Sequence, residues 1–182
     1  LYNIPVALWL DGDLDVAALR RSLQEIVRRH EVLRTTFAVR ARRPFQVIHP
    51  PAEFDLPSVD LSGLPVERRA PEASRLFAEE ARIPFDLARD LMLRAKLFRL
   101  GPSKHALFLN VHHIAADGWS LGVLYRDLNA FYEASCNKHA PVLDELPAQF
   151  ADFGAWQREA MRDEAMEGHI AYWKRRLADA PA

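Results

Sequence analysis

Two apolar stretches joined by a four-residue turn signal constrain the fold of this chain more than any other feature. In the first stretch, Leu93, Ala95 and Leu97 alternate with charged residues, which is the pattern of a half-buried β-strand. The second stretch runs from His105 to Ala115 and is apolar over most of its length. Gly101-Pro102-Ser103-Lys104 lies between them and favours a turn. We therefore predict two strands that form a hairpin.

The N-terminal third of the chain shows both extended and helical patterns. Residues 1–10 are rich in β-forming residues and stop at the turn signal Asp11-Gly12. Residues 16–33 carry apolar side chains at steps of three and four, and Asp15 is positioned to cap that helix. Short strands are expected over 35–40 and 45–49. This order of elements predicts an α/β or α+β fold.

The remaining segments are expected to be mostly helical. The proline-rich stretch over 44–71 predicts an irregular loop, followed by a helix with Pro71 in its first turn. Ser120 is the expected cap of a later helix, and two C-terminal helices are expected to pack Trp156 and Trp173 into a core.

Length and charge narrow the class of protein. The 182 residues have the size of one domain, and 24 Lys and Arg against 25 Asp and Glu give a net charge of −1. Nucleic-acid-binding domains have a basic excess, so we expect no nucleic-acid partner. No apolar run approaches the roughly 20 residues that span a bilayer, so we expect no membrane partner. The single Cys136 excludes an internal disulfide and fits a cytoplasmic location.

The segment from His112 to Ser120, His-His-Ile-Ala-Ala-Asp-Gly-Trp-Ser, holds the residues best suited to chemistry. On a regular strand His112 and His113 point to opposite faces, so one imidazole can face a cleft and the other the body of the protein. The turn at Asp117-Gly118 then leads to a helix N-terminus, which attracts negative charge. A base beside such a helix start is suited to acyl transfer.

Three other interpretations of these residues stay open. The histidines can be ordinary strand residues, with Asp117-Gly118 as a plain turn. Chelation of one metal ion by His112, His113 and Asp117 is disfavoured by their opposed directions, and we expect no metal site. Gly118-Trp119-Ser120-Leu121-Gly122 also matches the G-x-S-x-G elbow of hydrolases, for which Asp144 or Asp152 and His169 have the expected order. However, no glycine-rich oxyanion segment precedes it.

Two arginines at the end of the first predicted helix have two possible roles. Arg29 and Arg34 lie where basic residues favour the helix C-terminus. Alternatively, one of them pairs with Asp117 and fixes the loop after the histidines.

Three segments together resemble the condensation domains of nonribosomal peptide synthetases. His112 to Ser120 is similar to the family motif HHxxxDGWS, and Arg29 to Phe37 is similar to RHExLRTxF at every fixed position. Asp152 to Arg158 is similar to DxAxWQR, with Gly154 where alanine is usual. The resemblance extends from Tyr2 to about Leu177, and the family's first motif is missing. HHxxxDG by itself also occurs in other acyltransferases of the chloramphenicol-acetyltransferase type.

The resemblance implies a particular fold. It implies an α/β (α+β) sandwich with a mixed, largely antiparallel sheet and helices packed on it, forming one lobe of a chloramphenicol-acetyltransferase-like pseudodimer. Family members have two similar lobes with the active tunnel between them. We therefore expect residues 1–182 to be the N-terminal lobe, which carries the catalytic motif, and the C-terminal lobe to be absent.

The resemblance also implies an enzyme that forms amide bonds. The amine of an acceptor aminoacyl thioester attacks a donor acyl or peptidyl thioester. His113 is the expected catalytic residue, together with His112, Asp117 and Gly118. Arg29 and Arg34 are expected to support the motif structurally, and Trp119 and Ser120 to line the substrate tunnel. The segments Tyr2–Pro5 and Pro84–Leu87 resemble the subclass that joins two L-configured residues.

The implied partners are the missing C-terminal lobe, donor and acceptor peptidyl carrier proteins, and an adenylation domain in the same synthetase. The lobe itself is expected to bind no cofactor, because the substrates are carried on the 4′-phosphopantetheine of the carrier proteins. We expect the isolated chain to be inactive. The alternatives are a non-catalytic fragment that docks carrier proteins and another HHxxxDG acyltransferase. No local pattern indicates which amino acids are joined.

Overall fold

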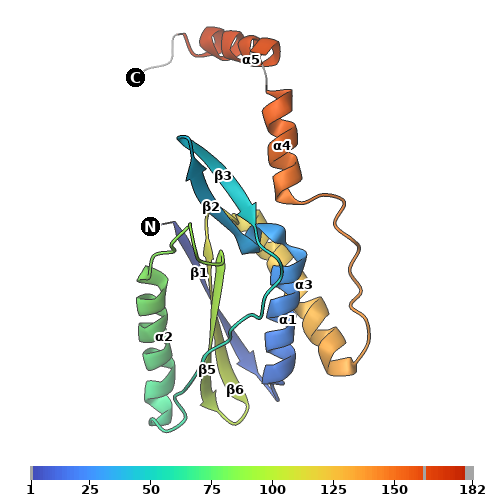
Figure 1. The fold of residues 1–182 in the computed structure, drawn as a ribbon. Coiled ribbons are helices and arrows are strands. Elements are labelled where there is room, and N and C mark those ends of the chain that lie inside the picture. The colour runs from blue at the N-terminus through green and yellow to red at the C-terminus, as the bar shows by residue number, and fades with distance from the viewer. Residues whose placement is uncertain (1, 162, 179–182) are drawn as a thin grey trace. The chain divides into compact units, whose positions relative to one another are not determined.

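A mixed four-stranded sheet forms the centre of residues 1–145, one of two units in the chain. The computed structural model describes residues 2–161 and 163–178. The strand order is β1-β6-β5-β4, of which Figure 1 labels β1, β5 and β6. β6 (Lys104–His112) pairs antiparallel with β1 (Asn3–Asp11) and with β5 (Leu93–Gly101), and β4 (Ser58–Asp60) pairs parallel with β5. The expected mixed, largely antiparallel sheet is therefore confirmed.

The predicted hairpin is β5-β6, and its alternating side chains give the sheet two apolar faces. Leu97 and Leu107 are opposite each other in register and belong to the cluster on one face. Phe98 and Phe108 belong to a second cluster on the other face. Both faces are apolar because helices cover both, and this explains why β6 is apolar almost throughout.

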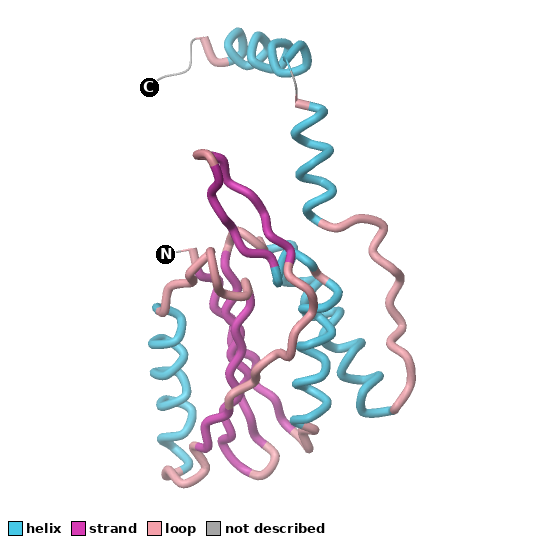
Figure 2. The backbone as a smooth tube through the Cα atoms, viewed as in Figure 1, coloured by secondary structure: helices cyan, strands magenta, loops and turns pink. Residues whose placement is uncertain are grey.

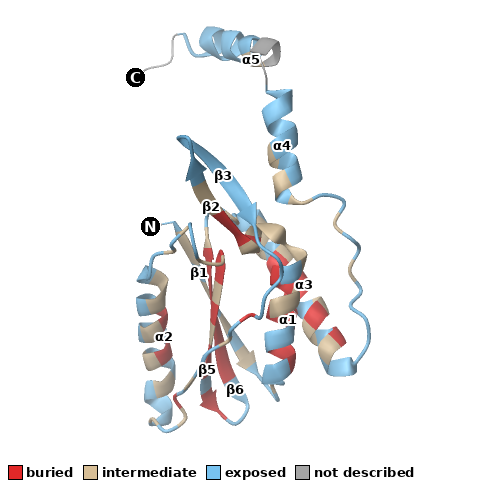
Figure 3. Ribbon diagram, viewed as in Figure 1, coloured by how far each residue is buried: buried red, intermediate tan, exposed pale blue. Residues whose placement is uncertain are grey.

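Helices cover the two faces of this sheet. α1 (Val16–Arg29) and α3 (Gly118–Asn137) contribute to the first cluster, and α2 (Val66–Arg82) contributes to the second. Figure 3 shows buried residues where the helices and the central strands face each other. The expected cap Asp15 is confirmed, because its Oδ1 accepts a hydrogen bond of 2.8 Å from the Ala18 N–H.

The proline-rich stretch contains more regular structure than its composition predicts. It includes β4, which is held by pairing with β5, and it includes the first turn of α2. The prediction that Pro71 lies in the first turn is wrong, because α2 begins five residues earlier at Val66. Pro71 and Glu67 are both exposed, so the Glu67 carbonyl that Pro71 leaves without an intrahelical partner can bond to water.

A separate two-stranded hairpin follows α1 through the 3-10 helix η1 (Glu31–Arg34). β2 (Thr35–Arg40) and β3 (Arg43–Ile48) pair antiparallel, which confirms both expected strands. β2 buries its first two residues, whereas every residue of β3 is exposed. Within the described residues, the buried part of this hairpin thus lies at the end nearest α1.

Residues 146–182 form the second unit. It contains α4 (Phe150–Ala160) and α5 (Asp163–Arg176), and an irregular segment precedes α4 (Figure 2). The two expected helices are confirmed, but Trp156 and Trp173 are 63% and 55% exposed in this chain, so their predicted core position is wrong here. No helix within the described residues has both the length and the hydropathy of a membrane span.

Candidate active site

The histidine pair lies where the middle strand of the sheet ends. The strand ends at His112, because the Ala115 N–H bonds back to the His112 carbonyl at 2.9 Å and closes a turn. The His113 N–H donates to the Tyr2 carbonyl at 2.7 Å, which ties the first residue of this turn to the segment preceding β1. The expected strand to Ala115 is therefore three residues too long, and strand alternation does not orient His113.

His112 is half-buried and held by its neighbours. Its Nδ1 accepts a hydrogen bond of 3.1 Å from the Ile114 N–H, so the neutral ring carries its hydrogen on Nε2. The ring of Phe85 meets it edge-on at 5.6 Å between centroids. Burial, and then the neighbouring His113, lower the pKa of His112 below its ordinary value. His112 is therefore a neutral ring whose Nδ1 is already engaged.

His113 differs from His112 in exposure and in contacts. It is exposed, and its ring makes no hydrogen bond to any residue that the structure describes. We expected one imidazole to face the body of the protein and the other to face away from it. The burial of the two residues confirms this difference, because His112 is half-buried and His113 is exposed. Of the two rings, His113 is the more exposed, and neither of its nitrogen atoms is engaged by a described residue, whereas His112 has Nδ1 engaged.

Asp117 is the N-cap of α3. Its Oδ1 accepts from the Ser120 N–H at 2.9 Å and from the Ser120 hydroxyl at 2.6 Å, while the Ser120 Oγ accepts from the Asp117 N–H at 3.2 Å. These bonds form a capping box, so the prediction of Ser120 as the cap is wrong by three residues. Hydrogen bonds from the Ser120 side chain, and then from its backbone, lower the pKa of Asp117. The helix start thus already holds a carboxylate.

The two arginines have partners other than Asp117. Arg29 Nε donates to Asp127 Oδ2 at 3.1 Å, and Arg34 donates to Glu31 Oε1 at 3.1 Å and to the His49 carbonyl. Within the described residues Asp117 forms no ion pair, so the predicted pairing with Arg29 or Arg34 is not formed. The physical reason is the difference in burial. An unpaired carboxylate is costly in the interior, where Asp127 is fully buried, whereas water solvates the exposed Asp117.

Asp127 is a residue that sequence reasoning missed. Besides Arg29, it accepts from His30 Nε2 at 2.8 Å and from Arg126 at 2.8 and 3.0 Å. This carboxylate joins the end of α1 to the middle of α3, whose first residues follow the histidines. A signal was present, because Asp127 lies three residues after Leu124 and four before Phe131, on the apolar stripe of α3.

Gly118, Trp119 and Ser120 form the first turn of α3. A Cβ at Gly118 would meet no heavy atom within 4 Å, so the chain itself leaves room there for a side chain. Trp119 is 85% exposed. The Ser120 hydroxyl is engaged by Asp117, and β6 before it pairs antiparallel on both sides. The nucleophile elbow of a hydrolase needs a strand in a largely parallel sheet, so this context disfavours Ser120 as a nucleophile.

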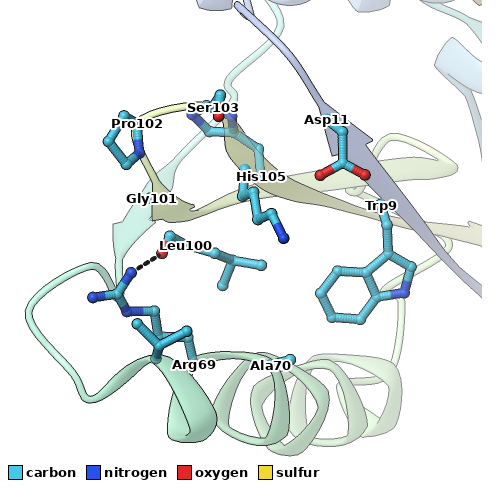
Figure 4. A pocket seen from close by; sticks show the side chains of 11 residues that line it. Trp9, Asp11, Arg69, Ala70, Leu100, Gly101, Pro102, Ser103 and His105 are labelled. Carbon is cyan, nitrogen blue, oxygen red and sulfur yellow. Dashed lines mark hydrogen bonds between the residues drawn. The ribbon is translucent and has the colours of Figure 1, made fainter.

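Two pockets lie away from the histidines. One has a volume of about 420 Å³ and lies between α2 and the β5-β6 turn, with Trp9, Asp11 and Arg69 in its lining (Figure 4). The other, of about 380 Å³, lies along β5 and includes Asp90 and Arg94. Neither has His112 or His113 in its lining. No group of three or more His, Cys, Asp or Glu side chains in the described part of the chain is placed to hold a metal ion.

Comparison with known proteins identifies the family. A family model described as "Condensation domain" matches residues 1–182. This chain belongs to the condensation-domain family. It is 49% identical over 178 residues to chondramide synthase cmdD of Chondromyces crocatus, which covers 98% of this chain and 5% of that protein. It is 40% identical over 185 residues to the dimodular nonribosomal peptide synthase of Bacillus subtilis, covering 99% of this chain and 8% of that protein.

Solved structures share the fold of this condensation-domain chain. The X-domain from teicoplanin biosynthesis is 38% identical with a TM-score of 0.85, and the match covers 99% of this chain and 39% of that one. The mixed α/β fold predicted from the family resemblance is therefore confirmed. The chain spans less than half of that solved structure and under a tenth of the two synthases named above.

Proposed function

We propose that this chain is the N-terminal lobe of a condensation domain and supplies the histidine motif for amide-bond formation in nonribosomal peptide synthesis. The observation that carries the proposal is the family match over residues 1–182 together with the exposed His113 at the end of the central strand. The substrates are a donor acyl or peptidyl thioester and an acceptor aminoacyl thioester, each on the phosphopantetheine arm of a carrier protein.

The reaction joins the acceptor nitrogen to the donor carbonyl carbon. As the C–N bond forms, the C–S bond breaks, the donor carrier leaves as a thiol, and one proton is lost from the amine. His113 is the group that orients the amine or accepts this proton, because its ring is free of bonds within the described chain. His112, with Nδ1 engaged by Ile114, holds the turn that presents His113.

Positioning contributes more to this reaction than proton transfer. Holding two reactants in place supplies roughly 7–11 kcal/mol, whereas a general base supplies typically 10²–10⁴-fold in rate, or roughly 3–5 kcal/mol. The tunnel expected between two lobes does the positioning, with Trp119 and Ser120 on this side. The family resemblance and the multidomain relatives support the C-terminal lobe, two carrier proteins and an adenylation domain of the same synthetase as partners.

His113→Ala in a two-lobe condensation domain containing this chain tests the proposal. We expect condensation between loaded carrier proteins to slow by about 10²–10⁴-fold, measured as peptide released from the donor carrier. His139→Ala is the matched control and should leave the rate unchanged. His139 is an exposed histidine outside the motif, and its ring bonds to the Ala140 carbonyl. Wild-type rates in the His113 variant would remove this residue from the mechanism.

The isolated chain is expected not to turn over loaded carriers, because one lobe provides only one wall of the tunnel. The match to 39% of a solved relative supports this expectation. If the 182-residue chain binds a carrier protein without turnover, the isolated piece is a docking fragment. Peptide formation by the 182-residue chain alone would contradict the lobe proposal.

A further inference from the structure

The loop after α2 places an aromatic ring against the histidine motif. Phe85 lies in this loop, and its ring meets the His112 ring edge-on with 5.6 Å between centroids and 73° between planes. The Tyr2 ring also lies near His112, with 6.3 Å between the ring centroids. The sequence alone distinguished Pro84–Leu87 only as a family resemblance, yet its Phe85 contacts the first histidine of the motif.

Arg94 on β5 fixes this loop in place. Its guanidinium donates to the Ile83 carbonyl at 3.2 Å, to the Pro84 carbonyl at 2.9 Å and to Asp90 Oδ2 at 2.6 Å. Its Cζ also lies 4.1 Å from the centre of the Phe85 ring. One planar cation therefore holds both ends of the loop and one face of its aromatic ring, which lysine could not do with a single ammonium group.

β1, which pairs with β6 on the side away from β5, also binds the start of this loop. Asn3 on β1 donates from Nδ2 to the Ala81 carbonyl at 2.8 Å and to the Ile83 carbonyl at 2.9 Å. Asn3 is the register partner of His112, and Arg94 is the partner of Asn110 on the other side of β6. The loop that carries Phe85 is thus tied to the strands on both sides of the strand that ends at His112.

We propose that Phe85, held by Arg94, is a positioning residue that fixes the His112 ring with its Nδ1 on the Ile114 N–H and thereby fixes the turn that presents His113. The proposal rests on the amide-forming role given above to the histidine pair. It adds that the orientation of the catalytic turn depends on an aromatic contact from a different segment of the chain.

Several groups lie near the His112 ring and can affect its pKa. His113 follows it, Tyr2 and Phe85 flank its ring, and Arg94 stands behind Phe85 in a pair with Asp90. Burial is the largest cause that lowers the His112 pKa. Removing the Phe85 ring opens His112 to water, which stabilises the charged form, so its pKa rises toward the ordinary value.

The first experiment is an NMR titration of the 182-residue chain, in which the His112 ring signals are assigned by their loss in His112→Gln. We expect the His112 pKa to rise in Phe85→Ala and in Arg94→Ala, and to stay unchanged in Arg89→Ala. Arg89 is a matched control because it belongs to the same loop and is 85% exposed. Phe85→Tyr keeps the ring and should keep the wild-type pKa. An unchanged His112 pKa in a folded Phe85→Ala variant would overturn the proposal.

The second experiment measures condensation in the two-lobe domain. We expect kcat for Phe85→Ala to fall by about 10- to 100-fold, with KM for the loaded carriers changed by less than about 2-fold, since a displaced catalytic group affects the reacting geometry. Arg94→Lys should lose part of this activity, and Phe85→Tyr should retain it. If Phe85 had a purely structural role, Phe85→Ala would lower the fraction of active enzyme and leave the acid limb of the pH–rate profile in place. We expect that limb to move to higher pH in Phe85→Ala, because the His112 pKa rises.

The two experiments separate this proposal from the proposed function. If the wild-type two-lobe domain forms no amide, the proposed function fails, and the titration alone decides whether Phe85 holds His112. If the His112 pKa shifts but kcat does not, the contact exists and the positioning role is overturned.

Discussion

Asp127→Asn removes one negative charge from the interior and leaves the side-chain volume almost unchanged. The wild-type carboxylate is fully buried and accepts hydrogen bonds from Arg29 at 3.1 Å and His30 at 2.8 Å, whose side chains are only 14% and 18% exposed. A third partner, Arg126, is 61% exposed, so water screens its contribution. The substitution therefore leaves two mostly buried donors facing a neutral amide.

The expected cost follows from these contacts. A hydrogen bond to a charged group contributes about 1.5–3 kcal/mol, and removing one partner of a buried ion pair costs about 3–5 kcal/mol. With two buried partners and a discounted third, we expect Asp127→Asn to lower the free energy of unfolding by about 3–5 kcal/mol. That is a large share of the roughly 5–15 kcal/mol typical of a domain.

Urea unfolding at pH 7, followed by circular dichroism, measures this loss. The transition midpoint should move to lower urea with little change in slope. Asp13→Asn is the matched control, because Asp13 is exposed and a surface change of this kind stays within about 0.5 kcal/mol. A loss of unfolding free energy below about 1 kcal/mol for Asp127→Asn would refute the reasoning. It would indicate that water solvates Arg29 and His30 as well as the carboxylate does.

Three further outcomes test the fold. The pKa of Asp127 is lowered in the folded chain because hydrogen bonds from Arg126 and His30 together outweigh its burial, which acts in the opposite direction. The stabilisation by this carboxylate is therefore present above the ordinary pKa near 3.9 and is lost as pH falls through the lower folded value. Urea midpoints between pH 6 and 2 should fall less in Asp127→Asn than in the wild type, and parallel profiles would contradict this. Asp15→Ala should cost about 1 kcal/mol of unfolding free energy, with Asp15→Asn nearly neutral because asparagine also caps; equal losses would exclude the cap. Leu109→Ala, at a fully buried position, should cost about 2–5 kcal/mol, whereas Val66→Ala, at a 73% exposed position, should stay within about 0.5 kcal/mol; similar thermal midpoints would contradict this core assignment.

The sequence by itself determined the features that depend on neighbours along the chain. The alternation of Leu93, Ala95 and Leu97 and the turn at 101–104 gave the β5-β6 hairpin, and the position of Asp15 gave the start of α1. These features are legible because strand and helix periodicities are two and 3.6 residues, and a cap reaches only three residues ahead. The motif around His112 and His113 is equally local, and it led to the family before any geometry was known.

Only the tertiary structure decided which distant groups meet. Arg29 pairs with Asp127, 98 residues away, because that carboxylate is buried beside the end of α1, whereas Asp117 lies exposed and bonds to Ser120. The contact of Phe85 with His112 likewise depends on how the loop after α2 is tied to β1 and β5. Such pairings depend on the positions of whole helices and strands, and buried charges and rings select among nearby partners only after the sheet has brought them together.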